Sequence, residues 1–185
     1  MNYTNKIKEF CAKIEEGGVV IYPTDTVLGL GCDATNKNAI RKLIKIKKRE
    51  KSKGLIILVD SINMLSEYVK KIPEAAIEKI NKTNHPTTII YPNPINLPSL
   101  LYNNNSIAIR ITKNKYCKKI IYKIKKPIVS TSANISGKPI PVNFTDLDHE
   151  LKNKVDCILK EKNTNMSNNP SKIYKIEGNT LILIR

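Results

Sequence analysis

The sequence predicts an α/β fold in which a twisted, mixed β-sheet is flanked by helices, and three observations lead to this class. Short apolar runs rich in β-branched residues alternate with longer stretches that have helical periodicity. A length of 185 residues suits one core, so we expect a single domain over residues 1–185. The connection around Gly178-Asn179 is too short for a helical crossover, so the sheet is expected to contain antiparallel as well as parallel pairs.

The first elements are a helix and a buried strand. Apolar side chains at helical spacing predict an amphipathic helix over residues 3–16, which Gly17-Gly18 ends. Residues 19–22 form an apolar run that is too short for a helix and rich in β-branched residues. We therefore predict a buried strand there, which Pro23 stops.

The remainder of the chain continues this alternation. Helical spacing predicts three more helices, over residues 38–48, 73–81 and 115–125. Short apolar runs predict six more strands, at residues 55–59, 88–91, 106–111, 128–130, 173–176 and 181–184. Two polar stretches, residues 93–105 and 162–169, are predicted to be loops.

Charge and composition narrow the classes of function. The net charge of +16 and the pI near 9.7 suit a protein that meets polyphosphates, either RNA or nucleotides. The lysines are spread along the whole chain, however, so a general compositional bias explains them equally well. Aromatic residues make up only 5% of the chain, which argues against the stacking platform that single-stranded RNA binders use. Tight, sequence-specific RNA recognition is therefore not expected.

Compartment and metal content follow from what the sequence lacks. No apolar run approaches the roughly 20 residues of a membrane helix, and the first 18 residues are charged rather than signal-like. We therefore expect a cytoplasmic protein without a membrane partner. The four cysteines are isolated and only two histidines are present, so neither a protein metal site nor a disulfide framework is expected.

Three polar segments follow predicted strands or helices, where open α/β sheets place their ligands. The segments are residues 23–31 (PTDTVLGLG), 47–54 (KKREKSKG) and 130–137 (STSANISG). Threonine hydroxyls and glycines in the first would let a polar ligand approach the backbone. Taken singly, the first segment is better explained as a turn or helix cap, and the second as a set of charges at a helix C-terminus. The third is explained equally well as a set of Asx and Ser/Thr turns.

Taken together, the three segments resemble the YrdC/TsaC family of threonylcarbamoyl-adenylate synthases, in its short form. The family's opening motif stands here as YPTDTVLGLG, its K-x-R motif as Lys47-Lys48-Arg49, and its S-x-N motif as Ser132-Ala133-Asn134. Two further segments agree with the family, at residues 107–111 and 168–173, as does the terminal ILIR. The five motifs occur in the family's order, and the resemblance covers essentially the whole chain. It implies the YrdC-like fold.

The resemblance also implies a reaction. Threonine and bicarbonate-derived CO2 would form a carbamate, whose carboxylate attacks the α-phosphorus of ATP and expels pyrophosphate. ATP would be a substrate accompanied by Mg²⁺, held mainly by phosphates and water. The adenylate would pass to a TsaD-type transferase. This partner would transfer the threonylcarbamoyl group to an adenosine of tRNAs that read codons starting with A, which gives threonylcarbamoyladenosine. Weak binding of tRNA or other RNA would be compatible with the charge.

Motif position assigns the site residues that the resemblance implies. Lys47 and Arg49 would act on the phosphates and the carbamate as catalytic residues, because cations offset the repulsion among anionic groups. Thr26, Arg110 and Ser130 would bind threonine or its carbamate. The nucleotide end would be lined by Ser106, Ser132, Asn134, Ser171 and Arg185.

Two other functions compete with this prediction. The first is a non-enzymatic RNA-binding or ribosome-maturation factor of the same fold, which the abundance of lysine would also fit. The second is a carbamoyl-transfer relative of the hydrogenase-maturation type. Relatives of that type have acylphosphatase and zinc-finger regions, which this chain does not contain. The K-x-R and S-x-N motifs favour the adenylate-forming enzyme.

Overall fold

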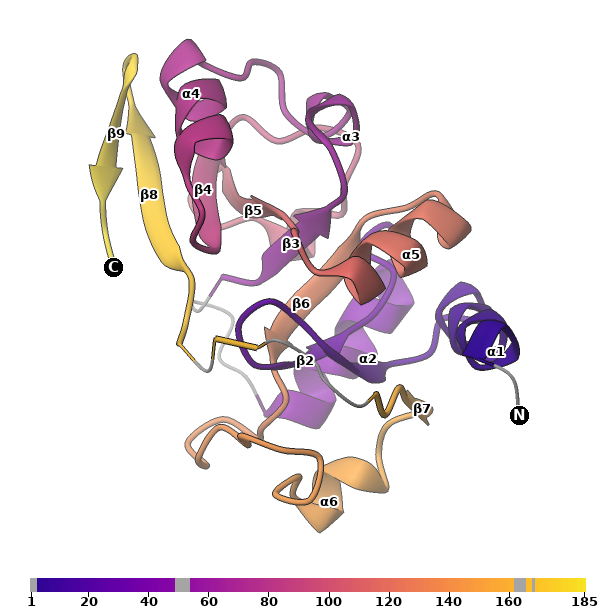
Figure 1. Cartoon of the computed structure of the whole chain (residues 1–185). Helices are drawn as coiled ribbons and strands as arrows, with labels where there is room; N and C mark the ends of the chain where they lie inside the picture. Colours follow the sequence, from indigo (N-terminus) through magenta and orange to yellow (C-terminus); the bar gives the residue numbers. More distant parts are fainter. Residues whose placement is uncertain (1–2, 49–53, 162–165, 168) are drawn as a thin grey trace.

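A nine-stranded, twisted mixed sheet runs through the molecule in the order β7-β1-β2-β6-β3-β5-β4-β8-β9 (Figure 1). The computed structural model describes residues 3–48, 54–161, 166–167 and 169–185. Three neighbouring pairs are parallel, namely β1 with β7, β3 with β5 and β4 with β8, and the other five are antiparallel. The predicted α/β class and the mixed character of the sheet are confirmed.

The described elements have the following bounds. The helices are α1 (Tyr3–Glu15), α2 (Lys37–Lys47), α3 (Ile62–Ser66), α4 (Glu74–Lys82), the 3-10 turn η1 (Ser99–Leu101), α5 (Lys115–Ile124) and α6 (His149–Lys152). The strands are β1 (Val20–Pro23), β2 (Leu28–Gly31), β3 (Ile56–Val59), β4 (Thr87–Pro92), β5 (Ser106–Ile111), β6 (Ile128–Ser132), β7 (Cys157–Ile158), β8 (Lys172–Glu177) and β9 (Thr180–Leu183).

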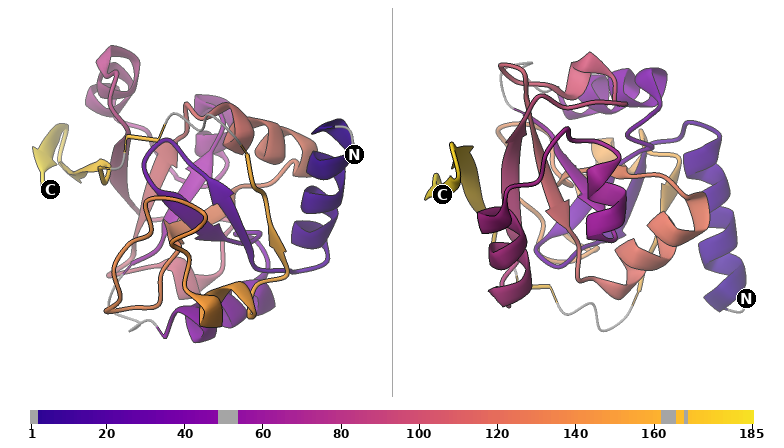
Figure 2. Two further views of the ribbon diagram at one scale, coloured as in Figure 1. Left: turned by 60° about the horizontal axis from the view of Figure 1, so that its bottom comes forward. Right: turned by 90° about the horizontal axis from the view of Figure 1, so that it is seen from above.

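Side chains alternate between the two faces of the sheet, and each face packs against its own helices. On β1, Val20 and Tyr22 join a core cluster with α1 and α5, whereas Ile21 joins a larger cluster that includes α2. The same alternation on β3 sends Leu58 toward α1 and α5, and Ile57 to the opposite side. Figure 2 shows α1 and α5 side by side against one flank of the sheet.

Strand β6 joins the two halves of the sheet, because it pairs with β2 on one side and β3 on the other. Close packing at this junction requires glycine. A Cβ atom at Gly31 of β2 would lie 2.1 Å from the carbonyl oxygen of Val129 and 2.7 Å from the hydroxyl of Tyr22. That hydroxyl donates a hydrogen bond of 2.9 Å to the same carbonyl. Gly31 thus allows a buried tyrosine to cross between the strands.

The predicted long elements are confirmed, with end positions shifted by one or two residues. The short connection predicted around Gly178 is the turn of the antiparallel β8–β9 hairpin, and Gly178 has a φ of +60° there. The prediction of residues 93–105 as a plain loop was wrong in part, since it contains η1 with the buried Leu101. Most of the second predicted loop, residues 162–169, lies outside the described residues.

Besides η1, the sequence patterns missed four short elements, which are β2, α3, α6 and β7. The two glycines in the LGLG sequence of β2 favour a ligand-binding loop over a strand. Among the helices in the described part of the chain, none has both the length and the apolar character needed to cross a membrane.

Candidate active site

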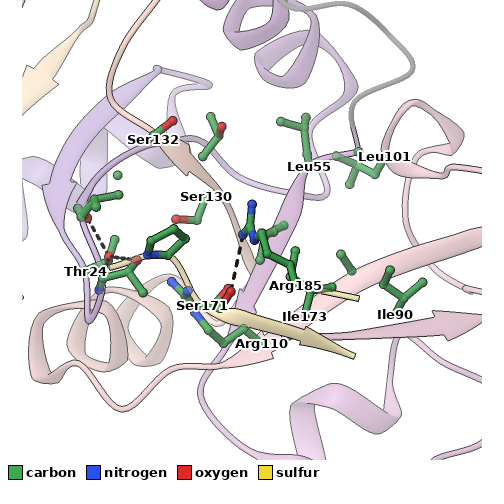
Figure 3. Close-up of a pocket in the computed structure, with 18 of the residues that line it drawn as sticks. Thr24, Leu55, Ile90, Leu101, Arg110, Ser130, Ser132, Ser171, Ile173 and Arg185 are labelled. Carbon is green, nitrogen blue, oxygen red and sulfur yellow. Dashed lines mark hydrogen bonds between the residues drawn. The ribbon is translucent and has the colours of Figure 1, made fainter. Parts of the chain in front are cut away.

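A cavity of about 400 Å³ opens on the face of the sheet that also carries the core cluster of α1 and α5 (Figure 3). Strand register explains its position. On β6, Ile128 packs in the core cluster of α1 and α5, whereas Ser130 and Ser132, further along the same face, line the cavity. The face thus changes from apolar at Ile128 to polar at Ser130 and Ser132, which leaves this part of the sheet available to a ligand.

Strand β5 supplies the cavity through alternate residues. Ser106, Ala108 and Arg110 line it, while Ile107 and Ile109 between them are buried in the core on the opposite face. The alternation places the guanidinium of Arg110 on the floor of a cavity within a sheet otherwise filled with apolar side chains. A positive charge is thus fixed at the floor of the cavity, where it can contact a bound ligand.

The polar end of the cavity is formed by the segment after β1. The backbone N–H of Thr26 donates to the Thr24 hydroxyl over 3.0 Å, and that hydroxyl donates to the carbonyl of Val27 over 2.7 Å. The two threonine hydroxyls are 3.0 Å apart. Because the proton of Thr24 is already used, Thr26 is the donor between them and keeps acceptor lone pairs toward the cavity. Thr26 can therefore accept a hydrogen bond from an ammonium or hydroxyl group of a ligand.

Arg110 is the principal charge at this end. Its side chain is only 3% exposed, and its Nη2 atom forms an ion pair of 2.9 Å with Oδ1 of Asp25. The angles of this contact are not those of a hydrogen bond, and Nε of Arg110 is buried with no hydrogen-bond partner in the part of the chain that the structure describes. A buried N–H group without a partner costs about 1–3 kcal/mol. The arrangement therefore favours a ligand with an acceptor oxygen.

Burial keeps the neighbouring titratable groups neutral. It raises the pKa of the Cys117 thiol, beside Asp25, to about 12, and it raises the pKa of the Tyr22 hydroxyl well above its ordinary value. Neither group is ionised near neutral pH. The polar end can bind and orient charged groups, whereas a cysteine nucleophile is not available there.

The other end of the cavity is apolar. Figure 3 shows Leu55, Leu101, Ile90 and Ile173 on the side away from Thr24 and Ser130. Such a wall suits a flat, weakly polar group such as a nucleobase. Sequence reasoning missed these residues because apolar side chains on strands and beside them look like ordinary core.

The K-x-R and S-x-N motifs are held together by one buried ammonium. Lys47, at the end of α2 and 2% exposed, donates to the carbonyl oxygens of Ser132 (2.6 Å) and Asn134 (3.0 Å) and to Oδ1 of Asn134 (3.1 Å). A weaker contact of 3.3 Å reaches the Ser132 hydroxyl, which itself donates to Asn134 Oδ1 over 2.6 Å. Ser132 lines the cavity, whereas Lys47 and Asn134 contact Ser132 without lining the cavity themselves. Arg49, the second cation of the motif, lies outside the described residues.

Ser171 connects the cavity to the end of the chain. Its hydroxyl lies 2.8 Å from the hydroxyl of the buried Thr88 on β4, and its carbonyl accepts a long hydrogen bond of 3.5 Å from Nη2 of Arg185. Both Ser171 and Arg185 line the cavity. A hydroxyl and a guanidinium thus meet near the apolar wall, where they could contact a ribose or a phosphate.

Of the ten predicted site residues, seven line this one cavity: Thr26, Ser106, Arg110, Ser130, Ser132, Ser171 and Arg185. The structure adds Thr24, Gly29 and Thr131 from the motif segments, along with the apolar wall. In the described residues there is no cluster of three or more His, Cys, Asp and Glu side chains that could hold a metal.

Comparisons with known proteins converge on one family. The model of the Sua5/YciO/YrdC family, described as "Telomere recombination", matches residues 12–185. A threonylcarbamoyl-AMP synthase of Wigglesworthia glossinidia brevipalpis is 37% identical over 185 residues, covering 95% of this chain and 94% of the relative. Another, of Hydrogenovibrio crunogenus, is 38% identical over 137 residues, covering 71% and 74%.

A solved structure agrees. The crystal structure of Sua5 of P. abyssi complexed with L-threonine superposes with a TM-score of 0.89 at 28% identity over 97% of this chain. This chain spans about half of the P. abyssi protein, 53% of its length.

Proposed function

The chain belongs to the Sua5/YciO/YrdC family, and we propose that it makes threonylcarbamoyl-AMP and pyrophosphate from L-threonine, bicarbonate and ATP. It is in this sense a nucleotidyltransferase. The observation that carries the proposal is the buried guanidinium of Arg110, whose Nε has no hydrogen-bond partner among the residues that the structure describes. It lies on the floor of a cavity that also presents the Thr26 hydroxyl and an apolar wall. An amino acid and a nucleotide both find complementary chemistry in it.

The two ends of the cavity divide the substrates. At the polar end, Arg110 binds the threonine carboxylate, Thr26 accepts from its amine or hydroxyl, and Ser130 lies beside them. At the apolar end, Ile90, Leu101 and Ile173 contact the adenine, with Ser106, Ser171 and Arg185 near the ribose and phosphates. This orientation directs the α-phosphate toward the carbamate that forms on the threonine nitrogen.

The reaction requires no protein nucleophile. Bicarbonate takes up a proton and gives CO2 and water. The amine nitrogen of threonine attacks this CO2 and loses a proton, and a carboxylate oxygen of the resulting carbamate attacks the α-phosphorus while the bond to pyrophosphate breaks. The chain's residues therefore act by positioning and by offsetting negative charge. Arg49 is proposed to meet the phosphates. Lys47 can join it by exchanging its bonds to Ser132 and Asn134 for phosphate oxygens. Ser132 and Asn134, with the loop that carries them, would then lie beside the phosphates.

Several proposals extend from this reaction. Mg²⁺ would be supplied with ATP and held by phosphate oxygens and water rather than by a protein site, and it would supply positive charge to offset that of the pyrophosphate. We expect the product to pass to a TsaD-type transferase, which places threonylcarbamoyl on adenosine in tRNAs that read codons starting with A. The enzyme would act in the cytoplasm, where these substrates meet.

Weak RNA binding is compatible with the enzyme. From residue 79 to residue 145 the chain has eleven basic residues and no Asp or Glu. Within this segment Lys115, Lys118, Lys119 and Lys123 share the exposed side of α5, away from the cavity. Such a face would attract phosphates through charge. The names of the relatives and the threonine complex support an enzyme rather than a non-enzymatic RNA-binding factor.

The proposed reaction is tested by omission. Purified protein is given ATP with Mg²⁺, L-threonine and bicarbonate, and pyrophosphate is measured while each component is withheld in turn. We expect release only in the complete mixture, with threonylcarbamoyl-AMP identified by mass spectrometry. Pyrophosphate release that is equally fast without threonine would refute the proposal. L-Serine and L-valine serve as matched amino acids that lack the methyl or the hydroxyl group.

A further inference from the structure

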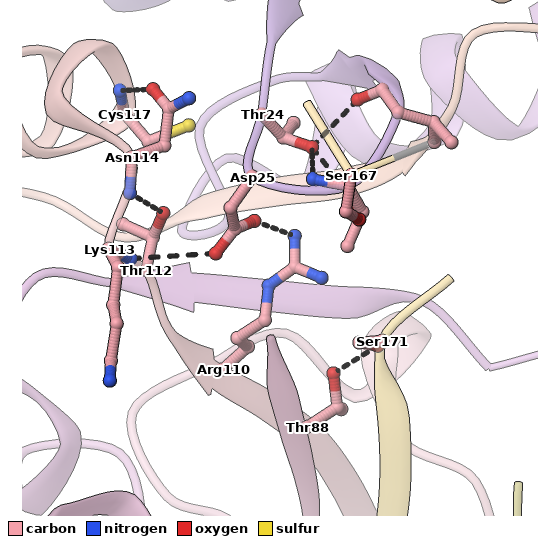
Figure 4. A network of polar contacts seen from close by, with 12 residues as sticks. Thr24, Asp25, Thr88, Arg110, Thr112, Lys113, Asn114, Cys117, Ser167 and Ser171 are labelled. Atoms are coloured by element: carbon pink, nitrogen blue, oxygen red, sulfur yellow. Dashed lines mark hydrogen bonds and ion pairs between the residues drawn. The ribbon is translucent and has the colours of Figure 1, made fainter. Parts of the chain in front are cut away.

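Asp25 lies between two residues that line the cavity, but it contributes to the cavity only through a neighbour. Thr24 and Thr26 both line it, whereas Asp25 turns toward Arg110 and the start of the segment after β5 (Figure 4). Its Oδ1 atom is 2.9 Å from Nη2 of Arg110, and its Oδ2 atom is 3.5 Å from the backbone N–H of Lys113. Its carbonyl accepts from the N–H of Ser167 over 3.3 Å. The carboxylate thus has these two contacts, and the backbone of Asp25 has a third.

The pair is buried, which gives the contact energetic weight. The Arg110 side chain is 3% exposed and that of Asp25 is 12% exposed. Water cannot stabilise a charge there as it does at the surface. Removal of either member of the pair would therefore leave the other as a buried charge without compensation, at a large cost in free energy. The position of the guanidinium therefore depends on Asp25. A solvent-exposed aspartate would have a much weaker effect on it.

The ion pair uses one side of the guanidinium and leaves the rest for a ligand. Nε of Arg110 is buried without a hydrogen-bond partner in the described structure. A free arginine side chain would rotate to satisfy this group. The ion pair between Asp25 and Nη2 opposes this rotation, so in the described residues Nε remains without a hydrogen-bond partner.

We propose that Asp25 is a positioning residue, which holds Arg110 in the orientation that receives the threonine carboxylate. The inference rests on the proposed function, since it takes threonine as the ligand of Arg110. It predicts a specific sign. If Asp25 merely competed with threonine for Arg110, removing its charge would tighten threonine binding. If Asp25 positions Arg110, removing its charge weakens threonine binding.

The experiment measures L-threonine binding by titration calorimetry, together with KM and kcat in the pyrophosphate assay. For Asp25→Asn we expect the Kd and KM for threonine to rise by about tenfold or more, because a charge-assisted contact loses its alignment. The KM for ATP should change by less than about twofold, since Arg110 lies away from the apolar end. Asp25→Glu keeps the charge but displaces it, so it should bind threonine with intermediate affinity.

Asp33→Asn is the matched control. Asp33 is 2% exposed and forms an ion pair of 2.9 Å with Lys126, but it does not line the cavity. Its loss should lower the thermal midpoint and leave the threonine Kd unchanged. A merely structural role for Asp25 would produce the same result in both variants, which would overturn the inference. So would wild-type or tighter threonine binding by Asp25→Asn.

The outcomes for the two proposals are distinguishable. Wild-type protein that binds threonine but releases no threonine-dependent pyrophosphate would refute the proposed function alone. If Asp25→Asn does not fold, as judged by circular dichroism, the folded Asp25→Glu variant decides the question. Wild-type Kd for threonine in that variant would count against positioning.

Discussion

The ammonium of Lys47 lies 3.1 Å from Oδ1 of Asn134, although 87 positions separate the two residues in the sequence. This contact joins the end of α2 to the loop after β6, and with the bonds to Ser132 it shapes one rim of the cavity. The two motifs are therefore parts of one physical unit. Contacts of this kind leave buried acceptors unsatisfied when the donor is removed.

Lys47→Met tests this unit. The substitution retains an unbranched side chain of nearly the same length but removes the charge and all of its hydrogen bonds to Ser132 and Asn134. We expect a loss of about 3 kcal/mol of stability in urea unfolding, and loss of threonine-dependent pyrophosphate release. Lys45→Met is the control, because Lys45 is exposed in the last turn of the same helix. Equal stability of the two variants would contradict the structural role of Lys47.

Glycine at the sheet junction gives a second prediction. Gly31→Ala should destabilise the protein by more than about 2 kcal/mol, because its Cβ would lie 2.1 Å from the backbone carbonyl of Val129.

Gly29→Ala should affect activity more than stability, since its Cβ would meet the Cγ2 of Thr24 at 2.8 Å and the Ser130 hydroxyl at 3.3 Å. Thermal melts and the pyrophosphate assay separate the two effects. Gly54→Ala, with its nearest contact at 3.9 Å, should melt like the wild type.

Arg49 is expected to matter for catalysis far more than for folding. If Arg49 binds phosphate or carbamate as proposed, Arg49→Ala should remove a charge-assisted contact worth roughly 2–5 kcal/mol, or about 30- to 5,000-fold in rate. Arg49→Lys should recover only part of this rate, because an ammonium lacks the bidentate fork. Thermal midpoints should stay close to that of the wild type and of the control Lys160→Ala. Near-normal turnover by Arg49→Ala would assign the phosphate contact to other residues.

RNA binding is predicted to be weak and steeply salt-dependent, with α5 as its principal surface. Replacing Lys115, Lys118 and Lys123 by alanine should lower the affinity for tRNA and reduce the salt slope by about two. Three exposed lysines elsewhere, Lys70, Lys71 and Lys160, provide a control with the same change of charge. Filter binding between low and physiological salt measures both quantities. An equal effect of the two triple variants would indicate general attraction, and affinity insensitive to salt would contradict the electrostatic basis.

Periodicity predicted the long elements because burial on one face imposes it directly on the sequence. It failed for β2, where Leu28 and Leu30 alternate with glycines that the packing of Tyr22 requires. It also failed for β7, whose two residues are too few to show a period. Short strands of this kind are specified by their neighbours in the sheet rather than by their own residues.

The polar side of the site could be predicted because its residues occur in motifs, whereas the tertiary relations could not. The sequence around Asp25 allows it either to orient a lysine or arginine of the site or to cap a turn, but it does not identify Arg110, 85 positions later, as the partner. Nor does the position of Lys47 in a cationic turn suggest that its ammonium is buried, since lysines at helix ends are normally solvated. The apolar wall was missed because core and nucleobase contacts use the same residue types.

The place of β6 in the sheet has a consequence for how the chain acquires its structure. Its partners β2 and β3 are synthesised about 100 and 70 residues earlier, yet neither can pair with it until residue 132 is available. During synthesis the edges of β2 and β3 that pair with β6 thus remain unpaired until β6 is made. The rim of the cavity that β6 contributes therefore forms late. Such long-range pairing slows folding, because the entropy of closing the intervening chain is lost before the strand contacts form.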